Sequence, residues 1–431
     1  MRSCEQLLLA LRGGEADGAL KSLYAVDGTD AARGRAVHVI EGFIERFGNA
    51  AQAALFSGPG RTEIGGNHTD HQHGHVLCAS VNLDILACAA PNGTDTVRVV
   101  SEGYPLVEVK LDSLTPREDE KNTSAALLRG VAARLTQSGH RLSGFDAYAV
   151  SDVISGSGLS SSAAYEVLIG TIFNRFFCGG ALDAVSIAKA GQYAENVYFG
   201  KPCGLMDQMG SAVGGAVAID FADPENPVVE RADYDFSQSG HALCIVDTGS
   251  CHADLTDDYA DITREMGAVA AYFGKRFLRE VLRDITLREF RSEIPVLRKE
   301  CGDRAVLRAM HFFNDDRRAW KEYVALKNGD FGSFLGLVNE SGLSSELLLQ
   351  NIWSTGAPRE QSVSLALTIG KELLAGEGAI RVHGGGFAGT VQAFVPLELL
   401  DGFKSGMEAV FGEGKCHILR IRPQGGCVVL E

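Results

Sequence analysis

The segment 58–77, GPGRTEIGGNHTDHQHGHVL, concentrates side chains that can bind or activate a ligand. Four of the chain's 11 histidines lie within eight of its residues, together with an arginine and an aspartate. His71, His73 and His75 alternate, so on a strand they would share one face and could hold a transition metal. A glycine interrupts the segment after His73, however, and no Cys or second His cluster at ligand spacing accompanies it. We therefore favour ordinary loop histidines, exposed or bonded to the backbone, over a metal site.

Two acidic residues farther along the chain stand among apolar or small neighbours. Glu195 and Asp207 are twelve positions apart and are separated by a Gly/Pro break, so we expect them on different helices. The flanking residues Leu205, Met206 and Met209 are typical of a buried segment. A buried carboxylate needs a partner or a chemical task, which makes Asp207 a candidate catalytic group.

The segment 151–170, SDVISGSGLSSSAAYEVLIG, predicts a strand that ends at Val153 and a helix that three serines open. Its glycines can adopt backbone conformations that other residues avoid. The unpaired N–H groups of the first helical turn, together with the helix dipole, form a ready anion site, and Ser162 could present its hydroxyl to a phosphate-bound Mg²⁺. The chain has no GxxxxGK[ST] sequence, so this is not a Walker loop. A serine-capped helix after a tight turn, with no ligand, is the alternative.

A third glycine-rich segment, HGGGFAGT, spans residues 383–390. In some esterases an HGGG sequence supplies the amides of an oxyanion hole, but the nucleophile motif G-x-S-x-G that should accompany it occurs nowhere in this chain. A serine hydrolase is therefore disfavoured. The segment could equally be a loop that lets two elements pack closely.

The elements that must position these groups follow from the periodicity of apolar residues. Strand-rich and helix-rich blocks follow one another without low-complexity linkers or repeats, which predicts an α+β protein of two lobes with a crossing at 221–240. Helices are expected within 1–50, at 122–138, 159–177 and 183–199, from about 205, up to about 345 and at 361–375, and strands within 53–110 and at 145–153, 242–248 and 380–395.

Length, charge and composition narrow the class of protein. At 431 residues the chain is long enough for two domains, and 45% apolar and 22% charged residues are typical of a soluble globular protein. The net charge of −15 would repel nucleic acid, and no apolar run approaches the ~18–20 residues that cross a bilayer. The ten cysteines are scattered without a CxxC pair, and the N-terminus does not read as a signal peptide. We therefore expect reduced thiols and a cytosolic location.

Taken in order, these segments resemble the motifs of the GHMP family of small-molecule kinases, and in particular of its galactokinase branch. The segment 58–70 looks like the signature of that branch, PGR followed by G-x-H-T-D, and 156–167, GSGLSSSAAYEV, is similar to the family's phosphate-binding motif. HGGGFAGT looks like the third family motif, and AENVYFGKPCGLMDQMGSAVGG at 194–215 matches the block around the catalytic aspartate. The similarity runs from roughly residue 53 to residue 395.

The resemblance implies the two-lobed α+β fold of the GHMP kinases. The N-terminal lobe of that fold is similar to domain 2 of ribosomal protein S5, and its C-terminal lobe is a ferredoxin-like α/β sandwich. We accordingly divide the chain into an N-terminal helical extension at 1–50, a first lobe with the sugar and phosphate motifs at 51–235 and a second lobe at 236–431. No function is assigned to residues 1–50.

The family's activity implies that the chain uses ATP to phosphorylate the anomeric hydroxyl of galactose, giving galactose 1-phosphate and ADP. By the same resemblance Asp207 orients or deprotonates that hydroxyl, and Arg61 stabilises the transition state. Ser162 and Glu195 would bind Mg²⁺. Phosphoryl transfer asks the protein mainly for such positioning and charge stabilisation. The remaining implied contacts are Asn67, His68, Thr69, Asp70 and Tyr259 for the sugar, and Ser101, Gly156, Ser157, Gly158, Leu159, Ser160, Ser161 and Ser162 for ATP.

One departure from the family pattern bears on the substrate. The usual run G-E-H-T-D reads G-N-H-T-D here, with Asn67 in place of the glutamate. An amide lacks the ionised acceptor, so a sugar other than galactose, such as arabinose, galacturonate or an amino sugar, stays open. A protein that binds sugar and ATP only to regulate a partner is the second alternative, although the presence of Arg61, Glu195 and Asp207 argues against it. The third motif also differs, with His383 and Ala388 where threonine and glycine are more common.

Overall fold

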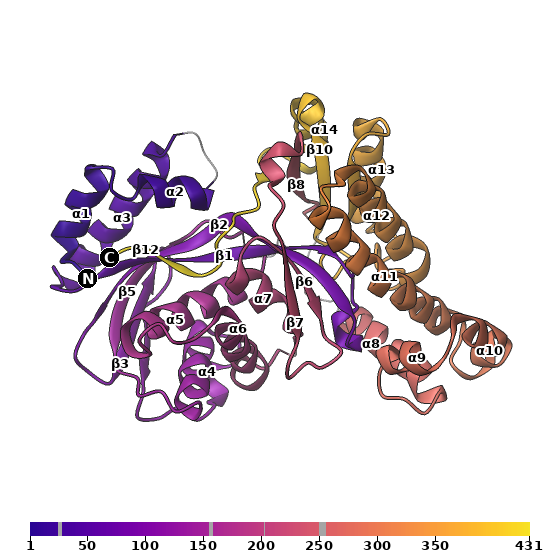
Figure 1. Cartoon of the computed structure of the whole chain (residues 1–431), viewed down its shortest axis with the longest axis horizontal. Coiled ribbons are helices and arrows are strands. Elements are labelled where there is room, and N and C mark those ends of the chain that lie inside the picture. Colours follow the sequence, from indigo (N-terminus) through magenta and orange to yellow (C-terminus); the bar gives the residue numbers. More distant parts are fainter. Residues whose placement is uncertain (25–27, 155–157, 202, 250–255) are drawn as a thin grey trace.

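The computed structural model describes residues 1–24, 28–154, 158–201, 203–249 and 256–431 (Figure 1). Within these residues the larger sheet has eight strands in the order β12-β1-β2-β5-β3-β4, with β6 paired to β2 and β7 to β6. The smaller sheet has four strands in the order β11-β8-β10-β9. Two sheets mixed with many helices confirm the α+β class expected from the sequence. The strands are β1 (Ala54–Gly65), β2 (His75–Pro91), β3 (Thr96–Ser101), β4 (Val107–Lys110), β5 (Phe145–Ser151), β6 (Ala216–Asp220), β7 (Val228–Ala232), β8 (His241–Asp247), β9 (Ala379–His383), β10 (Thr390–Pro396), β11 (Cys416–Leu419) and β12 (Cys427–Leu430).

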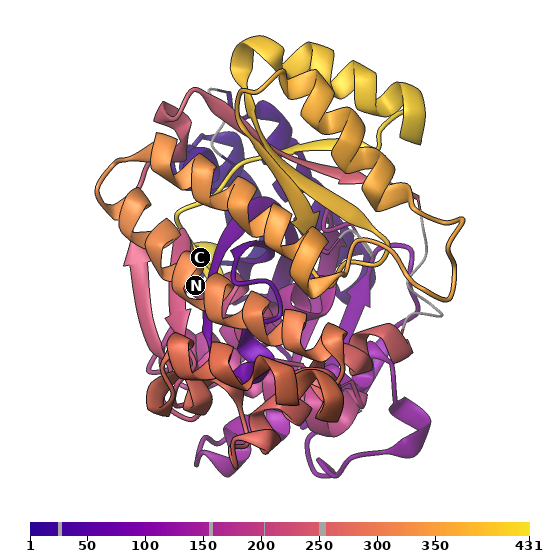
Figure 2. The ribbon, with the colours of Figure 1, turned by 90° about the vertical axis from the view of Figure 1, so that its right-hand side faces the viewer.

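Helices cover both faces of the larger sheet, with α1–α3 on one side and α4–α7 on the other (Figure 1). In the second lobe α13 and α14 pack on one face of the smaller sheet and α12 on the other (Figure 2). The helices are α1 (Cys4–Arg12), α2 (Asp17–Tyr24), α3 (Asp30–Phe47), α4 (Ser124–Gln137), α5 (Ser161–Phe177), α6 (Ala184–Tyr193), α7 (Met206–Val213), α8 (Thr256–Tyr272), α9 (Leu278–Asp284), α10 (Leu287–Glu300), α11 (Asp303–Lys327), α12 (Phe331–Ser344), α13 (Ser362–Leu374) and α14 (Leu400–Phe411), with shorter turns η1 (Asp70–Gln72), η2 (Glu118–Glu120), η3 (Ala194–Phe199), η4 (Phe236–Gln238), η5 (Ser345–Leu349) and η6 (Leu397–Leu399).

The central strands β1 and β2 are buried along most of their length because both of their faces are covered. Leu55 packs with the N-terminal helices, whereas Phe56 packs with α4 and α5, as the alternation of side chains along a strand requires. The contact with α5 is so close that a Cβ at Gly58 would lie 2.4 Å from the carbonyl oxygen of Ala164. This approach holds the first turns of α5 against β1.

The two ends of the chain meet on the larger sheet (Figure 1). The N-terminal residues form α1–α3, and Leu7, Val39 and Phe43 of these helices are buried against the sheet. β12, at the other end, pairs antiparallel with β1, so residues 427–430 join the sheet of the first lobe. The proposed boundaries at residues 50 and 235 stay predictions.

Two segments differ from the sequence-based expectations. The single helix expected at 183–199 is interrupted, because α6 ends at Tyr193 and the π-helical turn η3 continues the chain to Phe199. The polar crossing expected at 221–240 contains β7, a strand at the edge of the larger sheet. β7 is mostly exposed, so its sequence, VVERA, lacks the apolar alternation of a half-buried strand.

Membrane segments and disulfides are two features that the composition argues against. Within the residues that the structure describes, no helix is both long and apolar enough to cross a bilayer. The nine cysteines of the same part of the chain are free thiols.

Candidate functional site

Arg61, on β1, and Asp207, in the first turn of α7, meet at the centre of the candidate site. Arg61 donates two hydrogen bonds to one carboxylate oxygen of Asp207, at 2.8 Å from Nε and 2.5 Å from Nη2. Its remaining nitrogen, Nη1, donates to the carbonyl oxygen of Gly158. Gly158 belongs to the segment between β5 and α5 that resembles the phosphate-binding motif, and this segment is called the phosphate loop below. The Arg61 side chain is buried, whereas the side chain of Asp207 is 21% exposed to solvent. The two predicted catalytic residues are therefore in contact, and Asp207 is the one that a substrate can reach.

The charge state of Asp207 follows from its surroundings. Burial alone would raise its pKa, but the guanidinium of Arg61 and the hydroxyl of Ser160 outweigh burial and hold the pKa of Asp207 below its ordinary value. The carboxylate is consequently ionised at neutral pH. A carboxylate with a low pKa is a weak base but a strong hydrogen-bond acceptor, which suits it to orient a hydroxyl group.

Ser160 connects this pair to the phosphate loop. It precedes α5 with a left-handed backbone, φ 54° and ψ 74°, and its side chain makes no capping bond to the helix. The hydroxyl instead donates to Oδ2 of Asp207 at 2.8 Å. The carbonyl of Leu159, whose side chain is buried, accepts a 3.0 Å bond from the Arg61 N–H. A non-glycine residue held in a left-handed conformation is common at functional sites.

The helix α5 begins at Ser161, directly after this loop. A backbone hydrogen bond joins the Ala164 N–H to the Ser160 carbonyl at 3.1 Å. The N–H groups before Ala164 in the first turn therefore have no carbonyl partner within the helix. Such amides, at the positive end of the helix dipole, favour a phosphate. Gly156 and Ser157 lie outside the described residues, and the ATP contacts expected of them stay predictions.

Ser162 and Glu195, the two predicted magnesium ligands, are joined by a 3.2 Å hydrogen bond from the hydroxyl to Oε1. Glu195 lies on η3 with 1% of its side chain exposed, and the amine of Lys201 is 3.6 Å from the same oxygen. Hard oxygen donors suit Mg²⁺, which takes only one or two protein ligands when phosphates and waters complete its shell. The hydroxyl of Ser162 and the carboxylate of Glu195 are donors of this kind, and their contact with Mg²⁺ stays a prediction. No group of three or more His, Cys, Asp or Glu among the described residues could hold a metal alone.

Gln208, which the sequence did not single out, fixes the orientation of Glu195. Its amide nitrogen donates to Oε2 of Glu195 at 2.8 Å and to Oε2 of Glu166 at 2.9 Å. Glu166 is fully buried on α5, and burial, followed by the charge of Glu195, raises the pKa of Glu166 well above its ordinary value. Glu166 could have been found from the sequence, because it is an acidic residue within the apolar helical run AAYEVLIG, where burial is expected.

His68 and Tyr259, both predicted to contact the sugar, meet on the third glycine-rich loop. His68 Nε2 lies 2.9 Å from the carbonyl oxygen of Gly385. The hydroxyl of Tyr259 donates to the carbonyl oxygen of Gly386 at 3.0 Å. The two rings are 6.3 Å apart between centroids. Burial, and then the neighbouring His71, lower the pKa of His68 to about 4, so the imidazole is neutral at pH 7. Because Nε2 of this neutral ring donates to the carbonyl, Nδ1 is the atom that can accept from a hydroxyl group.

The resemblance also implies sugar contacts for Asn67 and Thr69, but the structure places both side chains in the interior with no exposed surface. Asn67 Nδ2 donates to Oε1 of Glu63 at 2.8 Å and to the Gly384 carbonyl at 2.7 Å. Its Oδ1 accepts a 2.8 Å bond from Asn351. The hydroxyl of Thr69 donates to a backbone carbonyl of its own loop at 2.7 Å. Both side chains are therefore engaged within the protein and hold the loop in shape.

Asp70 and Ser101 lie at two edges of the site. The Asp70 side chain retains 12% of its surface, and a Cβ at Gly204, just before α7, would lie 2.1 Å from its Oδ2. Ser101 ends β3, where it is paired with Ala149 of the parallel strand β5. Because β5 leads into the phosphate loop, Ser101 lies at the same end of the sheet as that loop. The sugar contact of Asp70 and the nucleotide contact of Ser101 stay predictions.

The alternating histidines contact groups of the protein itself. His73 stacks on Phe277 with ring centroids 3.7 Å apart. His75 lies between two carboxylates, 3.3 Å from Asp220 and 3.0 Å from Asp316. These contacts join the predicted sugar-binding loop, residues 66–75 (the sugar loop), to the residue before α9, to α11 and to β6. In the described part of the chain they leave no cluster of metal ligands.

His383, in the third glycine-rich loop, bridges the two lobes. Its Nε2 lies 3.0 Å from the hydroxyl of Thr62 on β1, and its Nδ1 lies 3.0 Å from the hydroxyl of Thr390 on β10. A Cβ at Gly158 would lie 2.8 Å from His383 Nδ1. The third loop thus packs directly against Gly158. Its own glycines allow equally close contacts, since a Cβ at Gly386 would lie 2.1 Å from the carbonyl oxygen of Asn351.

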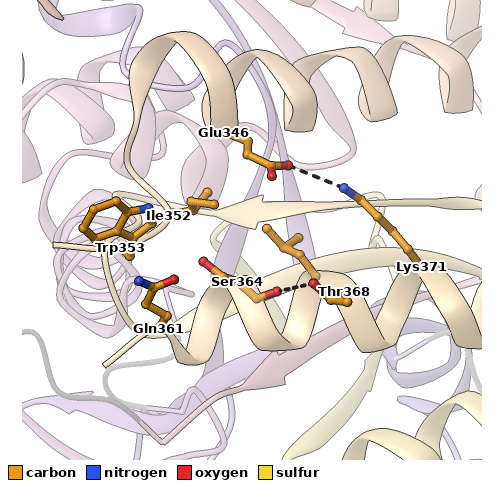
Figure 3. Close-up of a pocket in the computed structure, with 8 residues that line it drawn as sticks. Glu346, Ile352, Trp353, Gln361, Ser364, Thr368 and Lys371 are labelled. Carbon is orange, nitrogen blue, oxygen red and sulfur yellow. Dashed lines mark hydrogen bonds and ion pairs between the residues drawn. The ribbon is translucent and has the colours of Figure 1, made fainter. Parts of the chain in front are cut away.

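A separate hollow of about 230 Å³ opens in the second lobe between η5 and α13 (Figure 3). An ion pair between Glu346 and Lys371, 3.5 Å apart, crosses one side of it. None of the lining residues belongs to the predicted site, which lies where β1, α5, α7 and the third glycine-rich loop meet. The hollow is lined by Glu346, Ile352, Trp353, Gln361, Ser364, Leu367, Thr368 and Lys371.

Solved structures of small-molecule kinases share this fold. Galactokinase from Lactococcus lactis, solved in complex with galactose, matches with a TM-score of 0.75 and 21% identity over 90% of this chain and 98% of that chain. Mevalonate kinase from Methanococcus jannaschii matches with a TM-score of 0.59 and 14% identity over 86% and 98% of the two chains. Phosphomevalonate kinase from Streptococcus pneumoniae matches with a TM-score of 0.56 and 12% identity over 87% and 100%.

Family models match the segments that build the site. Residues 41–91 match the galactokinase galactose-binding signature, which covers Arg61 and the sugar loop. Residues 126–215 match the N-terminal domain of the GHMP kinases, which covers the phosphate loop, Glu195 and Asp207. These matches show that the chain carries the galactose-binding signature of galactokinases and a segment that matches the N-terminal domain of the GHMP kinases, in a fold that it shares with small-molecule kinases.

Proposed function

We propose that this sugar kinase transfers the γ-phosphoryl group of ATP to the anomeric hydroxyl of galactose, giving galactose 1-phosphate and ADP. The observation that carries the proposal is the carboxylate of Asp207, which accepts from Arg61 on one oxygen and from Ser160 of the phosphate loop on the other. This arrangement joins a candidate acceptor group, a cation and a phosphate-binding loop within one set of hydrogen bonds. The galactose-binding signature over residues 41–91 supports the choice of sugar.

In the proposed reaction Asp207 orients the acceptor hydroxyl. Its Oδ1 accepts two bonds from Arg61, whereas Oδ2 accepts one from Ser160 and keeps a free lone pair. A sugar hydroxyl that donates to Oδ2 would direct its own lone pair at the γ-phosphorus. The hydroxyl proton passes to the carboxylate as the new P–O bond forms and the bond to the ADP oxygen breaks. Because the pKa of Asp207 is low, this proton moves late, and orientation is the main contribution of the carboxylate.

Arg61 and the residues around Glu195 would stabilise the negative charge of the phosphate groups. The guanidinium of Arg61 bridges Asp207 and the Gly158 carbonyl, so it stands beside the loop where the transferred phosphoryl oxygens would gather charge. Mg²⁺ bound with ATP would neutralise further phosphate charge, and Ser162 and Glu195 are the residues that would hold it. Gln208 keeps the second oxygen of Glu195 occupied, which leaves Oε1 turned towards Ser162.

The proposed sugar contacts are His68, Asp70 and Tyr259. His68 is neutral, and burial followed by the charge of Asp258 raises the pKa of Tyr259 to about 12. Because His68 Nε2 and the Tyr259 hydroxyl donate to the carbonyls of Gly385 and Gly386, both side chains would offer the sugar an acceptor. Asn67 is not in this group because its amide is already bonded within the protein. The departure from the G-E-H-T-D run therefore gives no reason to prefer another sugar to galactose.

A coupled ADP-release assay over galactose, arabinose, galacturonate and galactosamine tests the proposal. We expect the highest kcat/KM with galactose, and ³¹P NMR should identify the product as a sugar 1-phosphate. A higher kcat/KM with one of the other sugars would reassign the substrate. No turnover with any of them, combined with thermal stabilisation by galactose and MgATP, would favour the non-catalytic sensor.

A further inference from the structure

We propose that the N-terminal extension positions the nucleotide site through one face of α3. Arg35, His38 and Gly42 are spaced i, i+3 and i+7, so they lie on one side of this helix. All three contact β5 or the residues that directly follow β3 and β5. These parallel strands end at Ser101 and at the root of the phosphate loop, so the inference rests on the ATP-binding role proposed for that end of the sheet.

Arg35 reaches the point at which the chain leaves β5 for the phosphate loop. Its Nε lies 3.0 Å from Oδ2 of Asp152, and its Nη2 donates to the Val150 carbonyl at 3.0 Å. The same Nη2 donates to the carbonyl oxygen of Asp84 at 3.0 Å, and the Asp152 N–H donates to that oxygen at 2.9 Å. One guanidinium thus contacts both the side chain and the backbone framework at the start of the loop.

Asp84, on β2, supplies the fixed anchor for Arg35. It has no exposed surface, and its Oδ1 accepts a 2.5 Å bond from Arg35 Nη1. Its Oδ2 accepts from the hydroxyl of Tyr24 on α2 at 3.0 Å and from Arg422 at 3.2 Å. A buried carboxylate with this many partners is costly to displace, because each lost partner would leave a charge unpaired. Asp84 therefore holds the Arg35 guanidinium beside Asp152, with which it forms an ion pair without a hydrogen bond from Nε.

His38 makes the corresponding contact at the end of β3. Its Nε2 lies 2.6 Å from Oε1 of Glu102, the residue after Ser101, and the hydroxyl of Tyr148 on β5 donates to the same oxygen at 2.9 Å. Gly42 permits the close packing that brings these groups together, since a Cβ there would lie 2.4 Å from Cε1 of Tyr148. The extension consequently holds the carboxylates that follow both strands.

Removing these two carboxylates should weaken nucleotide binding without affecting the sugar loop. Residues at the ends of β3 and β5 that are held in place before the nucleotide binds lose less conformational freedom on binding, which favours affinity. The side chains of Asp152 and Glu102 are 49% and 46% exposed, so their loss leaves no cavity and keeps the buried Arg35–Asp84 anchor. Exposed pairs of this kind contribute modestly, and we expect a combined loss of about threefold to tenfold in affinity for MgATP.

The test measures the dissociation constants of MgATP and of galactose separately by isothermal titration calorimetry, in the absence of turnover. The variant is Asp152→Asn/Glu102→Gln, and the matched control is Asp17→Asn/Asp30→Asn. The control removes the two carboxylates that pair with Arg33, on the same helix but away from the strands. We expect weaker MgATP binding with galactose affinity unchanged in the variant, and both affinities unchanged in the control.

The inference is overturned if the variant binds MgATP as tightly as the unmodified chain. Equal losses for MgATP and galactose, or an equal loss in the control, would also overturn it, because they would indicate a general effect on folding. An unmodified chain that binds no MgATP would refute the proposed function first, and the positioning role with it.

Discussion

Asn67 and Glu63 form a buried hydrogen-bonded pair, in which Nδ2 of Asn67 donates to Oε1 of Glu63 at 2.8 Å. Arg381 donates to the same carboxylate oxygen at 2.9 Å. The acidic group that the G-E-H-T-D run places at position 67 thus has a counterpart at position 63, on β1. The amide at 67 completes this arrangement, because a second carboxylate beside Glu63 would compete for one arginine.

Asn67→Glu should therefore destabilise the protein by about 2–4 kcal/mol, because it buries two neighbouring carboxylates. The double variant Glu63→Gln/Asn67→Glu restores one acid and one amide, and should recover most of the loss. Urea unfolding at pH 7 of the unmodified chain, the two single variants and the double variant gives the coupling free energy. A coupling close to zero would show that the two positions are independent.

Asp207→Asn should reduce kcat by about 10²–10⁴-fold while MgATP binding survives, because the amide cannot accept the hydroxyl proton. Ser160→Ala removes the bond to Oδ2 and should cost less, about tenfold. ADP release and calorimetric MgATP binding measure the two effects separately. Near-normal turnover of purified Asp207→Asn would exclude the role proposed for this carboxylate.

Glu195→Gln should raise the Mg²⁺ concentration needed for half-maximal rate, and Gln208→Met should do so by about tenfold, because the carboxylate loses the donor that orients it. Lys189→Ala is the matched control: Lys189 lies on α6, next to η3, and its amine bonds a loop carbonyl at Glu225. Mg²⁺ titrations at saturating ATP measure the shift. An unchanged Mg²⁺ requirement in Gln208→Met would argue against an orienting role for this amide.

His75 should make stability fall as the solution becomes alkaline. Burial alone would lower its pKa, but the hydrogen bonds to Asp220 and Asp316 outweigh burial and raise the pKa of His75 to about 9. A histidine whose pKa is raised by folding adds stability that is complete below its unfolded pKa of about 6.5 and is lost as the pH rises towards 9. Thermal unfolding between pH 6 and pH 9.5 should show this decline, and His75→Gln should flatten it. An equal slope in both proteins would assign the effect to other groups.

Glu322 should also make the stability of the protein fall as the pH rises, but for a different reason. Its side chain is fully buried on α11, neither carboxylate oxygen has a hydrogen-bond partner among the described residues, and burial raises its pKa well above the ordinary value. An acid whose pKa is raised by folding stabilises the protein below its unfolded pKa and loses that contribution as the pH rises. Glu322→Gln should therefore increase the midpoint temperature of thermal unfolding at pH 8–9. Glu340→Gln, which changes a mostly exposed acid on α12, should leave the midpoint unchanged.

Periodicity predicts the regular elements of this chain well because their buried faces repeat. The strand expected at 145–153 is found at Phe145–Ser151, and the helix expected at 122–138 is found at Ser124–Gln137. The π-helical turn that carries Glu195 has no such signal, because a turn of 6 residues at the end of a helix is too short to show a change of period. The strand β7 is missed because an exposed edge strand needs no apolar face.

The site is less predictable because its partners come from distant parts of the chain. Asn67 reads as a sugar contact from its place in the motif, but its backbone N–H bonds Asp315 and its side chain bonds Asn351, 248 and 284 positions away. Only the tertiary structure shows which face of the loop these groups cover. Arg61 and Asp207 pair across 146 positions, and their association followed from the family motif alone.

The pairing of β12 with β1 has a consequence for the order in which the first lobe can form. Residues 427–430 supply the neighbour of β1 on one side, and Arg422 contacts the buried Asp84, which lies 338 positions earlier in the chain. Before these residues have been made, the outer edge of β1 has no partner strand and the charge of Asp84 lacks one of its counter-ions. The first lobe is therefore completed only after the second lobe has been synthesised, and a chain truncated before Arg422 should be prone to association with others.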